Sequence, residues 1–380
     1  MDVKEELEIL RGEPIKVFTG NPMDIPCIET SDAEKLCKHP VVSVLMITYN
    51  HEPYIRQAIE GAMMQNTDFE FELVIGEDCS KDKTREICFE YQKKYPDKIR
   101  VLWWHENVNK LGGNGRRTRA HCRGEFIAYC EGDDFWTDPR KLQKQVDVMR
   151  RNPNVGMCFG LVDFFYQDSG RVVHPNPKYV RSGVMTGKEF CKWLLLEQNP
   201  KGRNILQTSG DMVRAAVLKE IEQNLWVRRT FNYDLCNWLG VGSMSDVYFL
   251  PEIVSTYRIN AGGITKTNFS RVMMDGDSVI YAFLREVFDY SPEEALRWTA
   301  KRFVRMWVNK AAALPRSEQR KVADQINAHP LLRQIFHRPY SIFMLLAIRL
   351  GVLNQKRAFW LNRIFWYLPR IGKPWKVKAS

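Results

Sequence analysis

The run Val41-Val42-Ser43-Val44-Leu45-Met46-Ile47-Thr48 is continuous in apolar and β-branched residues, as is typical of a strand buried on both faces of a parallel sheet. A helical segment from Tyr54 to about Met64 follows it. The same order of strand and helix then repeats, with an apolar run from Phe71 to Ile75, a helix from Thr84 to Tyr95 and a third run from Ile99 to Trp104. This alternation predicts an α/β fold, with a mostly parallel sheet flanked by helices.

Polar residues follow each of these runs. They are Thr48-Tyr49-Asn50, Glu77-Asp78, His105-Glu106-Asn107 and, after a further run at 126–130, Asp133-Asp134. The carboxyl ends of parallel strands share one edge, where open α/β sheets bind their ligands, so we expect these side chains to form a site. The chain has neither GxGxxG after the first strand nor GxxxxGK[ST], and this argues against a dinucleotide-binding fold and a P-loop.

The stretch Glu131-Gly132-Asp133-Asp134-Phe135-Trp136 places two adjacent carboxylates at the end of a buried strand. Desolvating two like charges is unfavourable unless a cation or hydrogen-bond donors compensate them. A divalent metal that carries a diphosphate would do so. The alternative is a solvated acidic turn.

The composition is that of a globular protein with room for two or three domains in 380 residues. No run of about 18 apolar residues occurs, and the acidic N-terminus does not resemble a signal peptide, so a cytoplasmic location is expected. The nine cysteines show no CxxC pair, which predicts reduced, packed thiols rather than a zinc site or a disulfide framework.

Four regions are predicted: an irregular extension at 1–39, an α/β domain at 40–270, a helical region at 271–335 and a basic, aromatic-rich amphipathic tail at 336–380. No Asp or Glu follows Asp324, whereas ten Lys or Arg lie between Arg333 and Lys378. These ten account for nearly all of the formal charge of +11. Such a tail suits the surface of an anionic membrane, on its inner face; a helical subdomain or an oligomer contact is the alternative.

The chain resembles the family 2 glycosyltransferases with the GT-A fold, particularly bacterial members that build surface polysaccharides. The likeness covers about residues 40–265. It rests on an ordered set of motifs: 42–50, Gly76-Glu77-Asp78-Cys79-Ser80 with Asp82 and Thr84, Glu106-Asn107 with Gly113-Asn114, 131–136, Lys141-Leu142-Gln143-Lys144-Gln145, Asp234 and Tyr257-Arg258.

The resemblance implies a nucleotide-sugar site in this chain. The donor nucleoside would be held by Thr48, Tyr49, Asn50, Glu52, Asp78, Asn107 and Asp133. Asp134 would bind Mn or Mg on the diphosphate, a hard oxygen ligand for a hard cation. For Asp78, a purely local role as an Asx turn or N-cap before Thr84 is the alternative.

Relatives of this type invert the anomeric centre by direct displacement, with a carboxylate that takes the proton of the acceptor hydroxyl. The match for this base is Asp234, for which the alternative role is an N-cap of a helix at 235–239. Asp211 and Glu222 are weaker candidates.

Four further residues are candidates for contacts with the diphosphate or acceptor: Arg119, Trp136, Arg258 and Asn260. A solvated face for Arg119 and a packed position for Trp136 are the alternatives. Many relatives carry His where this chain has Asn260, and an amide is a poorer metal ligand than imidazole.

The leading hypothesis is a metal-dependent, inverting glycosyltransferase that moves a sugar from a nucleotide donor, UDP-linked by resemblance, to a saccharide or lipid-linked saccharide. A non-catalytic nucleotide-sugar or glycan-binding relative is the alternative. Nucleic-acid binding, which the basic tail suggests, is disfavoured because acidic strand ends repel phosphates.

Overall fold

A computed structural model describes residues 3–11, 26–108, 113–175, 182–197, 206–222, 233–260, 279–295, 299, 304, 307–308, 311–328, 332–333, 336 and 342–350. The chain divides into two compact units. One comprises residues 18–228 and 233–266, and the other comprises 1–17, 229–232 and 267–380.

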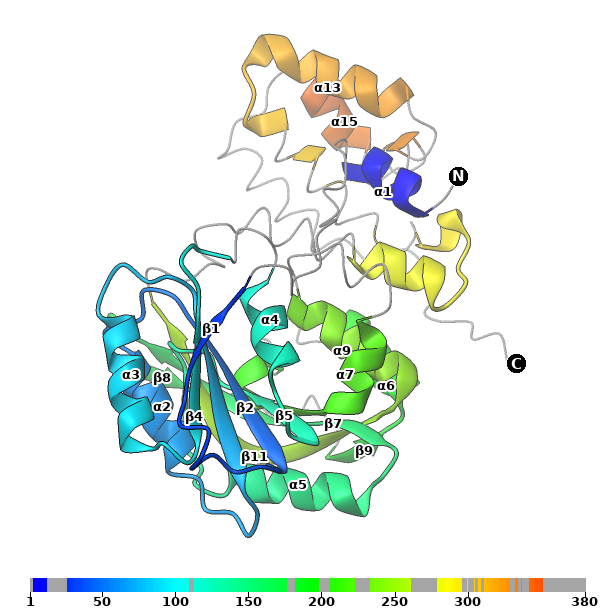
Figure 1. Ribbon diagram of the computed structural model, residues 1–380. Coiled ribbons are helices and arrows are strands. Elements are labelled where there is room, and N and C mark those ends of the chain that lie inside the picture. The colour runs from blue at the N-terminus through cyan, green and yellow to red at the C-terminus, as the bar shows by residue number, and fades with distance from the viewer. Residues whose placement is uncertain are drawn as a thin grey trace. The chain divides into compact units, whose positions relative to one another are not determined.

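The larger unit is built on one mixed sheet (Figure 1). Its parallel part follows the order β4-β3-β2-β5, from strands at Ile99–Trp103, Phe71–Glu77, Val42–Thr48 and Phe126–Tyr129. Thr48 pairs with Glu77, and Glu77 with Trp103, so these strands end together. The predicted α/β fold with a mostly parallel sheet flanked by helices is confirmed for this part.

The other half of the sheet was not expected from the sequence. There β10 (Asp211–Arg214) lies antiparallel between β5 and β7 (Val155–Tyr166), and β11 (Asp246–Ile259) runs parallel to β7. Shorter strands complete it: β6 (Phe135–Trp136) and β9 (Gly183–Met185) pair with β11, and β8 (Arg171–Val173) with β7. The four residues of β10 are too few for a clear periodic pattern, and register shifts interrupt the long strand β11, so this half was not predicted.

Alternate residues of the strands pack against helices on opposite faces. Val42, Val44 and Met46 share one core with α2 (Ile55–Met63), α3 (Thr84–Lys94) and α5 (Lys141–Arg151). On the other face, Val74 and Leu102 form a second cluster. In Figure 1, α2 and α3 lie together at one side of the sheet, whereas α4 (Asn114–Ala120) and α9 (Tyr233–Met244) lie at the other.

The remaining described elements of this unit connect these strands. They are α6 (Gly187–Lys192), a π-helical turn η4 (Trp193–Glu197), a 3₁₀ turn η5 (Thr208–Gly210) and α7 (Ala215–Ile221). Thr186 caps α6 with a reciprocal capping box to Glu189, which satisfies two donors of the first turn.

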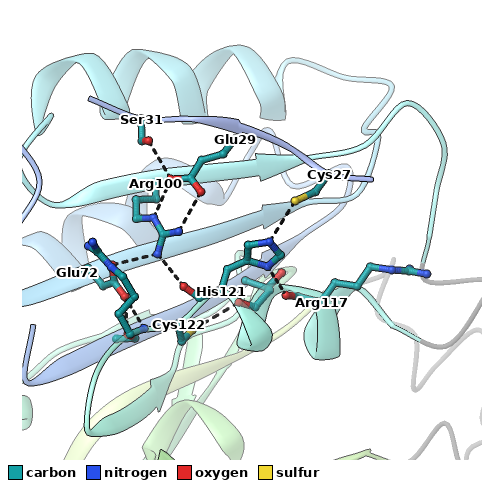
Figure 2. Close-up of polar contacts among 11 residues, drawn as sticks. Cys27, Glu29, Ser31, Glu72, Arg100, Arg117, His121 and Cys122 are labelled. Carbon is teal, nitrogen blue, oxygen red and sulfur yellow. Dashed lines mark hydrogen bonds and ion pairs between the residues drawn. The ribbon is translucent and has the colours of Figure 1, made fainter. Parts of the chain in front are cut away.

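An ion network around the buried residues Glu72 and Arg100 joins β1 (Ile28–Thr30) to the amino end of the sheet (Figure 2). Glu72 is fully buried and accepts hydrogen bonds from Ser43 Oγ at 2.6 Å, Arg123 Nη2 at 2.6 Å and Arg100 Nη1 at 3.2 Å. Arg100 also donates to both oxygens of Glu29, at 2.8 and 2.9 Å. Residues 1–39 therefore contain a strand of the sheet rather than only irregular chain.

The smaller unit is helical in its described part and includes α1 (Val3–Arg11), another departure from the irregular extension that was expected. Buried Glu6 of α1 accepts from Arg285 Nε at 2.9 Å and Tyr281 Oη at 2.7 Å. The unit continues with α13 (Arg316–Ala328) and α15 (Ile342–Arg349). Among the described residues, no helix has the length and apolarity to cross a membrane. Most of the predicted tail, 351–380, lies outside the described residues.

Candidate active site

The segments after β2 and β3 are tied to each other by side chain to backbone hydrogen bonds. Asn50, in the left-handed region at φ 55°, donates its N–H to Ser80 Oγ at 2.9 Å, and its own Oδ1 accepts from Lys81 N at 2.8 Å. Glu52 Oε2 accepts from Lys83 N at 3.1 Å. Two residues predicted to hold the nucleoside thus fix the shape of the edge, while Tyr49 beside them is 38% exposed.

Asp82 completes this connection, a role that the sequence reasoning missed. Its Oδ2 accepts from Glu52 N at 3.1 Å, and its Oδ1 accepts from Thr84 N at 3.0 Å. Thr84 Oγ1 accepts in turn from His51 N at 2.8 Å. The Asp-x-Thr spacing at the start of a predicted helix was the available signal.

Asp78 joins three strand ends. Its N–H donates to Thr48 O at 3.0 Å, its Oδ1 accepts from Val108 N at 2.6 Å, and its carbonyl accepts from Asn107 Nδ2 at 3.2 Å. The side chain is buried, and it makes no cap of α3, whose N-cap residue is Lys83. The structure therefore brings Thr48, Asp78 and Asn107 together, as the predicted shared edge requires.

The two adjacent carboxylates lie on the turn between β5 and β6. Asp134 is buried, with Oδ1 accepting from Arg258 N at 2.9 Å and Oδ2 without a hydrogen-bond partner. Asp133 Oδ2 accepts from Asn260 Nδ2 at 2.9 Å and lies 3.9 Å from His51 Nε2. Burial, with Asp133 and Glu131 nearby, raises the pKa of Asp134 well above its usual range.

Arg258 holds this turn from β11. Its Nε donates to the Asp133 carbonyl at 2.7 Å, and its other nitrogens donate to Gln57 Oε1, at 2.6 Å, and to Gln167. The guanidinium also lies over the rings of Tyr54, Phe135 and Phe165, at 4.9 to 5.3 Å from the centroids. Arg258 and Asn260, predicted as contacts of the diphosphate or acceptor, here position the carboxylate turn.

Gly132 permits the close approach of this turn to β2. A Cβ at this position would lie 2.7 Å from Thr48 Oγ1 and 2.9 Å from His51 Nδ1. Such distances are shorter than van der Waals contact, so any larger residue would force Thr48, His51 or the turn itself to shift.

The carboxylate turn could supply part of the coordination of a divalent cation, but not a complete set of ligands. No group of three or more His, Cys, Asp and Glu side chains in the described part of the chain forms a complete cage. Mg²⁺ and Mn²⁺ in phosphate-handling sites, however, are usually held by one or two carboxylates together with substrate phosphates. The unpartnered Oδ2 of Asp134 is a buried ligand oxygen of this kind.

A second acidic group lies beside the first. Glu131 Oε1 accepts from Thr208 Oγ1 at 2.7 Å, and burial together with the charge of Asp234 raises the pKa of Glu131 to about 7. Asp234 lies in the first turn of α9 rather than at its N-cap. Its side chain is accessible to solvent, yet surrounding protein desolvates it enough to raise its pKa to about 6.

The two weaker candidates for the base are already engaged. Asp211 is buried and accepts from Trp238 Nε1 at 2.6 Å, and Glu222 forms an ion pair with Arg119. Arg119 is itself buried, so the solvated face does not describe it. Trp136 is packed, with Nε1 donating to Ser209 O at 2.9 Å and Lys141 Nζ 4.3 Å from its ring, so the packed alternative is observed.

Comparison with known proteins identifies the family. The profile described as Glycosyl transferase family 2 matches residues 43–210. An uncharacterized protein of Mycobacterium tuberculosis is 33% identical over 223 residues, which cover 59% of this chain and 60% of that protein. The chain thus spans less than two thirds of that relative. An uncharacterized glycosyltransferase of Methanocaldococcus jannaschii is 31% identical over 225 residues, covering 58% of this chain and 71% of the relative.

Among solved structures, TarS of S. aureus is similar with a TM-score of 0.53 at 17% identity, over 84% of this chain and 54% of that one. A crystal structure of its residues 1–349 in complex with UDP-GlcNAc gives a TM-score of 0.50 at 18% identity, over 81% of this chain and 90% of that one. These likenesses concern the fold. With its ordered motifs, its sheet and its carboxylate turn, the chain belongs to glycosyltransferase family 2, and its larger unit has the GT-A fold.

Proposed function

We propose that the protein is a metal-dependent, inverting glycosyltransferase. It would transfer a sugar from a UDP-linked donor to a saccharide or lipid-linked saccharide in surface polysaccharide biosynthesis. The observation that carries this proposal is the pairing of two unlike carboxylates: Asp134, buried with an unpartnered oxygen, and Asp234, accessible with a pKa of about 6. Asp134 is suited to bind a divalent cation, and Asp234 is suited to accept a proton.

The donor would lie along the edge formed by Thr48, Asp78 and Asn107, with Tyr49 exposed beside it. Asp133 and Asp134 would face the ribose and the diphosphate. A divalent metal, when bound through Asp134, would neutralise the negative charge that develops on the leaving nucleoside diphosphate. The segment 50–52, fixed by Ser80, Lys81 and Lys83, keeps the nucleoside side of this edge in place before the donor arrives.

Asp234 would act as the general base. With a pKa of about 6 it is mostly ionised at pH 7, and its side chain is accessible to an incoming acceptor. The acceptor oxygen forms a bond to the anomeric carbon as its proton passes to Asp234. The bond between that carbon and the β-phosphate oxygen breaks, and the nucleoside diphosphate leaves with the electron pair.

The test is release of nucleoside diphosphate from a panel of UDP-, GDP- and dTDP-sugars, with Mn²⁺, with Mg²⁺ and with chelator. The wild type is compared with Asp134→Ala. Metal-dependent release that the variant loses supports the proposal. Binding of a nucleotide sugar or a glycan without release from any donor would instead identify a non-catalytic binding protein.

We also propose that residues 336–380 bring the enzyme to an anionic membrane surface on the cytoplasmic side. The described support is α15, where Leu346 is 48% exposed and Arg349 is exposed, followed directly by Leu350, which is 64% exposed. Sedimentation of the full chain with phosphatidylglycerol vesicles, but not with phosphatidylcholine vesicles, is expected. Equal recovery in the supernatant with both vesicles would contradict this proposal.

A further inference from the structure

A fully buried lysine of α5 has no part in the proposed mechanism. Lys141 is 0% exposed, and burying a charge usually lowers stability, so its presence calls for another explanation. Its Nζ donates to Gln145 Oε1 at 2.8 Å and to the Asp211 carbonyl at 3.4 Å, and it lies 4.3 Å from the centroid of the Trp136 ring. Burial lowers the pKa of Lys141 to about 8, so the ammonium is mostly protonated at pH 7.

Gln145, one turn further along α5, holds the same stretch of backbone. Its Nε2 donates to Gly210 O at 2.8 Å. The indole Nε1 of Trp136 donates to Ser209 O at 2.9 Å. With the contact from Lys141, three consecutive backbone carbonyls therefore accept hydrogen bonds from three buried side chains.

The backbone held in this way lies between the carboxylate turn and the helix that carries the proposed base. On one side, Thr208 Oγ1 donates to Glu131 of the turn at 2.7 Å. On the other side, Asp211 Oδ2 accepts from Trp238 Nε1 at 2.6 Å, and Trp238 lies one turn after Asp234 on the same side of α9. Burial raises the pKa of Asp211 well above its usual range, and the nearby charge of Asp234 adds to this effect. The position of the base helix relative to the turn is thus coupled to the held backbone.

We infer that Lys141 and Gln145 are positioning residues of the transfer reaction, which fix the base Asp234 relative to the carboxylate turn. This inference rests on the proposed function, because that function assigns the base to Asp234. Asp134 has an anchor of its own in the backbone N–H of Arg258, so donor binding should depend little on Lys141. The rate of the chemical step should depend on it strongly, since a shift of about 1 Å at a reacting group can lower a rate about 10²-fold.

The test uses Lys141→Met and Gln145→Met, which remove the polar groups but keep the approximate length of the side chains. Nucleotide release in Mn²⁺ is measured with the most active donor of the panel above, with water in place of the acceptor, and gives kcat and KM. Calorimetric titration gives the affinity for UDP in Mn²⁺. Each variant should lower kcat at least about tenfold, while KM and the affinity for UDP stay within about threefold of the wild type.

The same helix supplies matched controls, a second lysine and a second glutamine that bind elsewhere. Lys144 forms ion pairs with Asp138 and Glu252, and Gln143 donates to Asp147 at 2.9 Å. Lys144→Met and Gln143→Met should leave kcat, KM and the affinity for UDP unchanged.

A double-mutant cycle tests the connection through Asp211. Trp238→Phe removes the N–H that binds Asp211 and should itself lower kcat. If Lys141 acts through this bond, adding Lys141→Met to Trp238→Phe should lower kcat by no more than about a further twofold. Effects on kcat that multiply would overturn the inference, because Lys141 would then act independently of Asp211.

The results separate this inference from the proposed function. If the wild type does not bind UDP, or releases nucleotide from no donor of the panel, the proposed function fails and the inference fails with it. If the wild type is active but folded Lys141→Met keeps its kcat, or loses affinity for UDP in proportion to kcat, only the inference is overturned. Melting temperatures identify a variant that does not fold. Replacing a buried charge by an apolar side chain of similar volume is often neutral or stabilising, so Lys141→Met decides if Gln145→Met unfolds.

Discussion

Replacing Arg258 by Lys keeps the charge but removes the forked donor that holds the carboxylate turn. The guanidinium is 5% exposed and donates to the Asp133 carbonyl, Gln57 and Gln167, whereas an ammonium on a flexible stem can keep about one of these contacts. Two lost hydrogen bonds from a charged group, at about 1.5 to 3 kcal/mol each, predict a loss of roughly 3 to 6 kcal/mol in the free energy of unfolding. Lost contacts with three aromatic rings act in the same direction.

The same change should weaken donor binding, because Asp133 and Asp134 are placed by this side chain and by the backbone of the same residue. We expect the affinity for UDP in Mn²⁺ to fall at least about tenfold, which corresponds to roughly 1.4 kcal/mol. Urea unfolding followed by tryptophan fluorescence gives the stability, and calorimetric titration gives the affinity.

Arg56→Lys is a matched control. Arg56 also makes two hydrogen bonds, to Glu90 at 2.9 and 2.8 Å, and lies over a tyrosine ring at 5.8 Å, but it is exposed. Exposed pairs contribute little, so this variant should behave nearly as the wild type. If Arg258→Lys is no less stable than Arg56→Lys, or if it binds UDP as the wild type does, Arg258 does not hold the carboxylate turn in place.

Three other predictions concern the site. Asp234→Asn should lower kcat about 10² to 10⁴-fold and abolish the rise of kcat/KM with pH near 6. Its affinity for UDP should not change. An unaltered pH profile would exclude Asp234 as the base. Gly132→Ala should lower the free energy of unfolding by about 1 to 3 kcal/mol, because the added Cβ meets Thr48 and His51. Gly115→Ala is the control, because its added Cβ would lie in open space and should not destabilise the protein. Equal stability of the two variants would be inconsistent with crowding at Gly132. In the folded state the pKa of Glu131 is about 7, and the pKa of Asp134 is also raised. The stability that these two groups provide is therefore present below about pH 4 and is lost as the pH rises to about 7. Urea unfolding from pH 4.5 to 7.5 should show this decline, and Mn²⁺ with UDP should flatten it; a free energy of unfolding that rises with pH would contradict the prediction.

The parallel half of the fold could be predicted because each buried strand there is a continuous apolar run with a helix after it. The positions of Thr48, Asp78 and Asn107 at one edge follow from that topology. The antiparallel half could not be predicted in the same way, since β10 has four residues and β11 is interrupted by register shifts near Pro251. Such strands are recognised by their partners, which a single sequence does not display.

The roles of individual polar residues depended on partners far away in the sequence. The sequence predicted that Asn50, Glu52 and Arg258 lie at the site, but not that their side chains bind Lys81, Lys83 and Gln57. Likewise β1 pairs with β4, and Glu29 of β1 forms an ion pair with Arg100, 71 residues away in the sequence. Local patterns indicate which residues are polar, whereas tertiary contacts decide what they bind.

The roles of Asp134 and Asp234 are tested together by calorimetric titration of UDP into the wild type, Asp134→Asn and Asp234→Asn. Each protein is titrated with Mn²⁺ and with chelator, and nucleotide release from the best UDP-sugar is then measured. We expect metal-dependent UDP binding by the wild type and by Asp234→Asn, loss of that metal dependence in Asp134→Asn, and rapid nucleotide release by the wild type alone. If UDP binds all three proteins equally with and without metal, or does not bind at all, the assignment of Asp134 to the metal and Asp234 to the proton is contradicted.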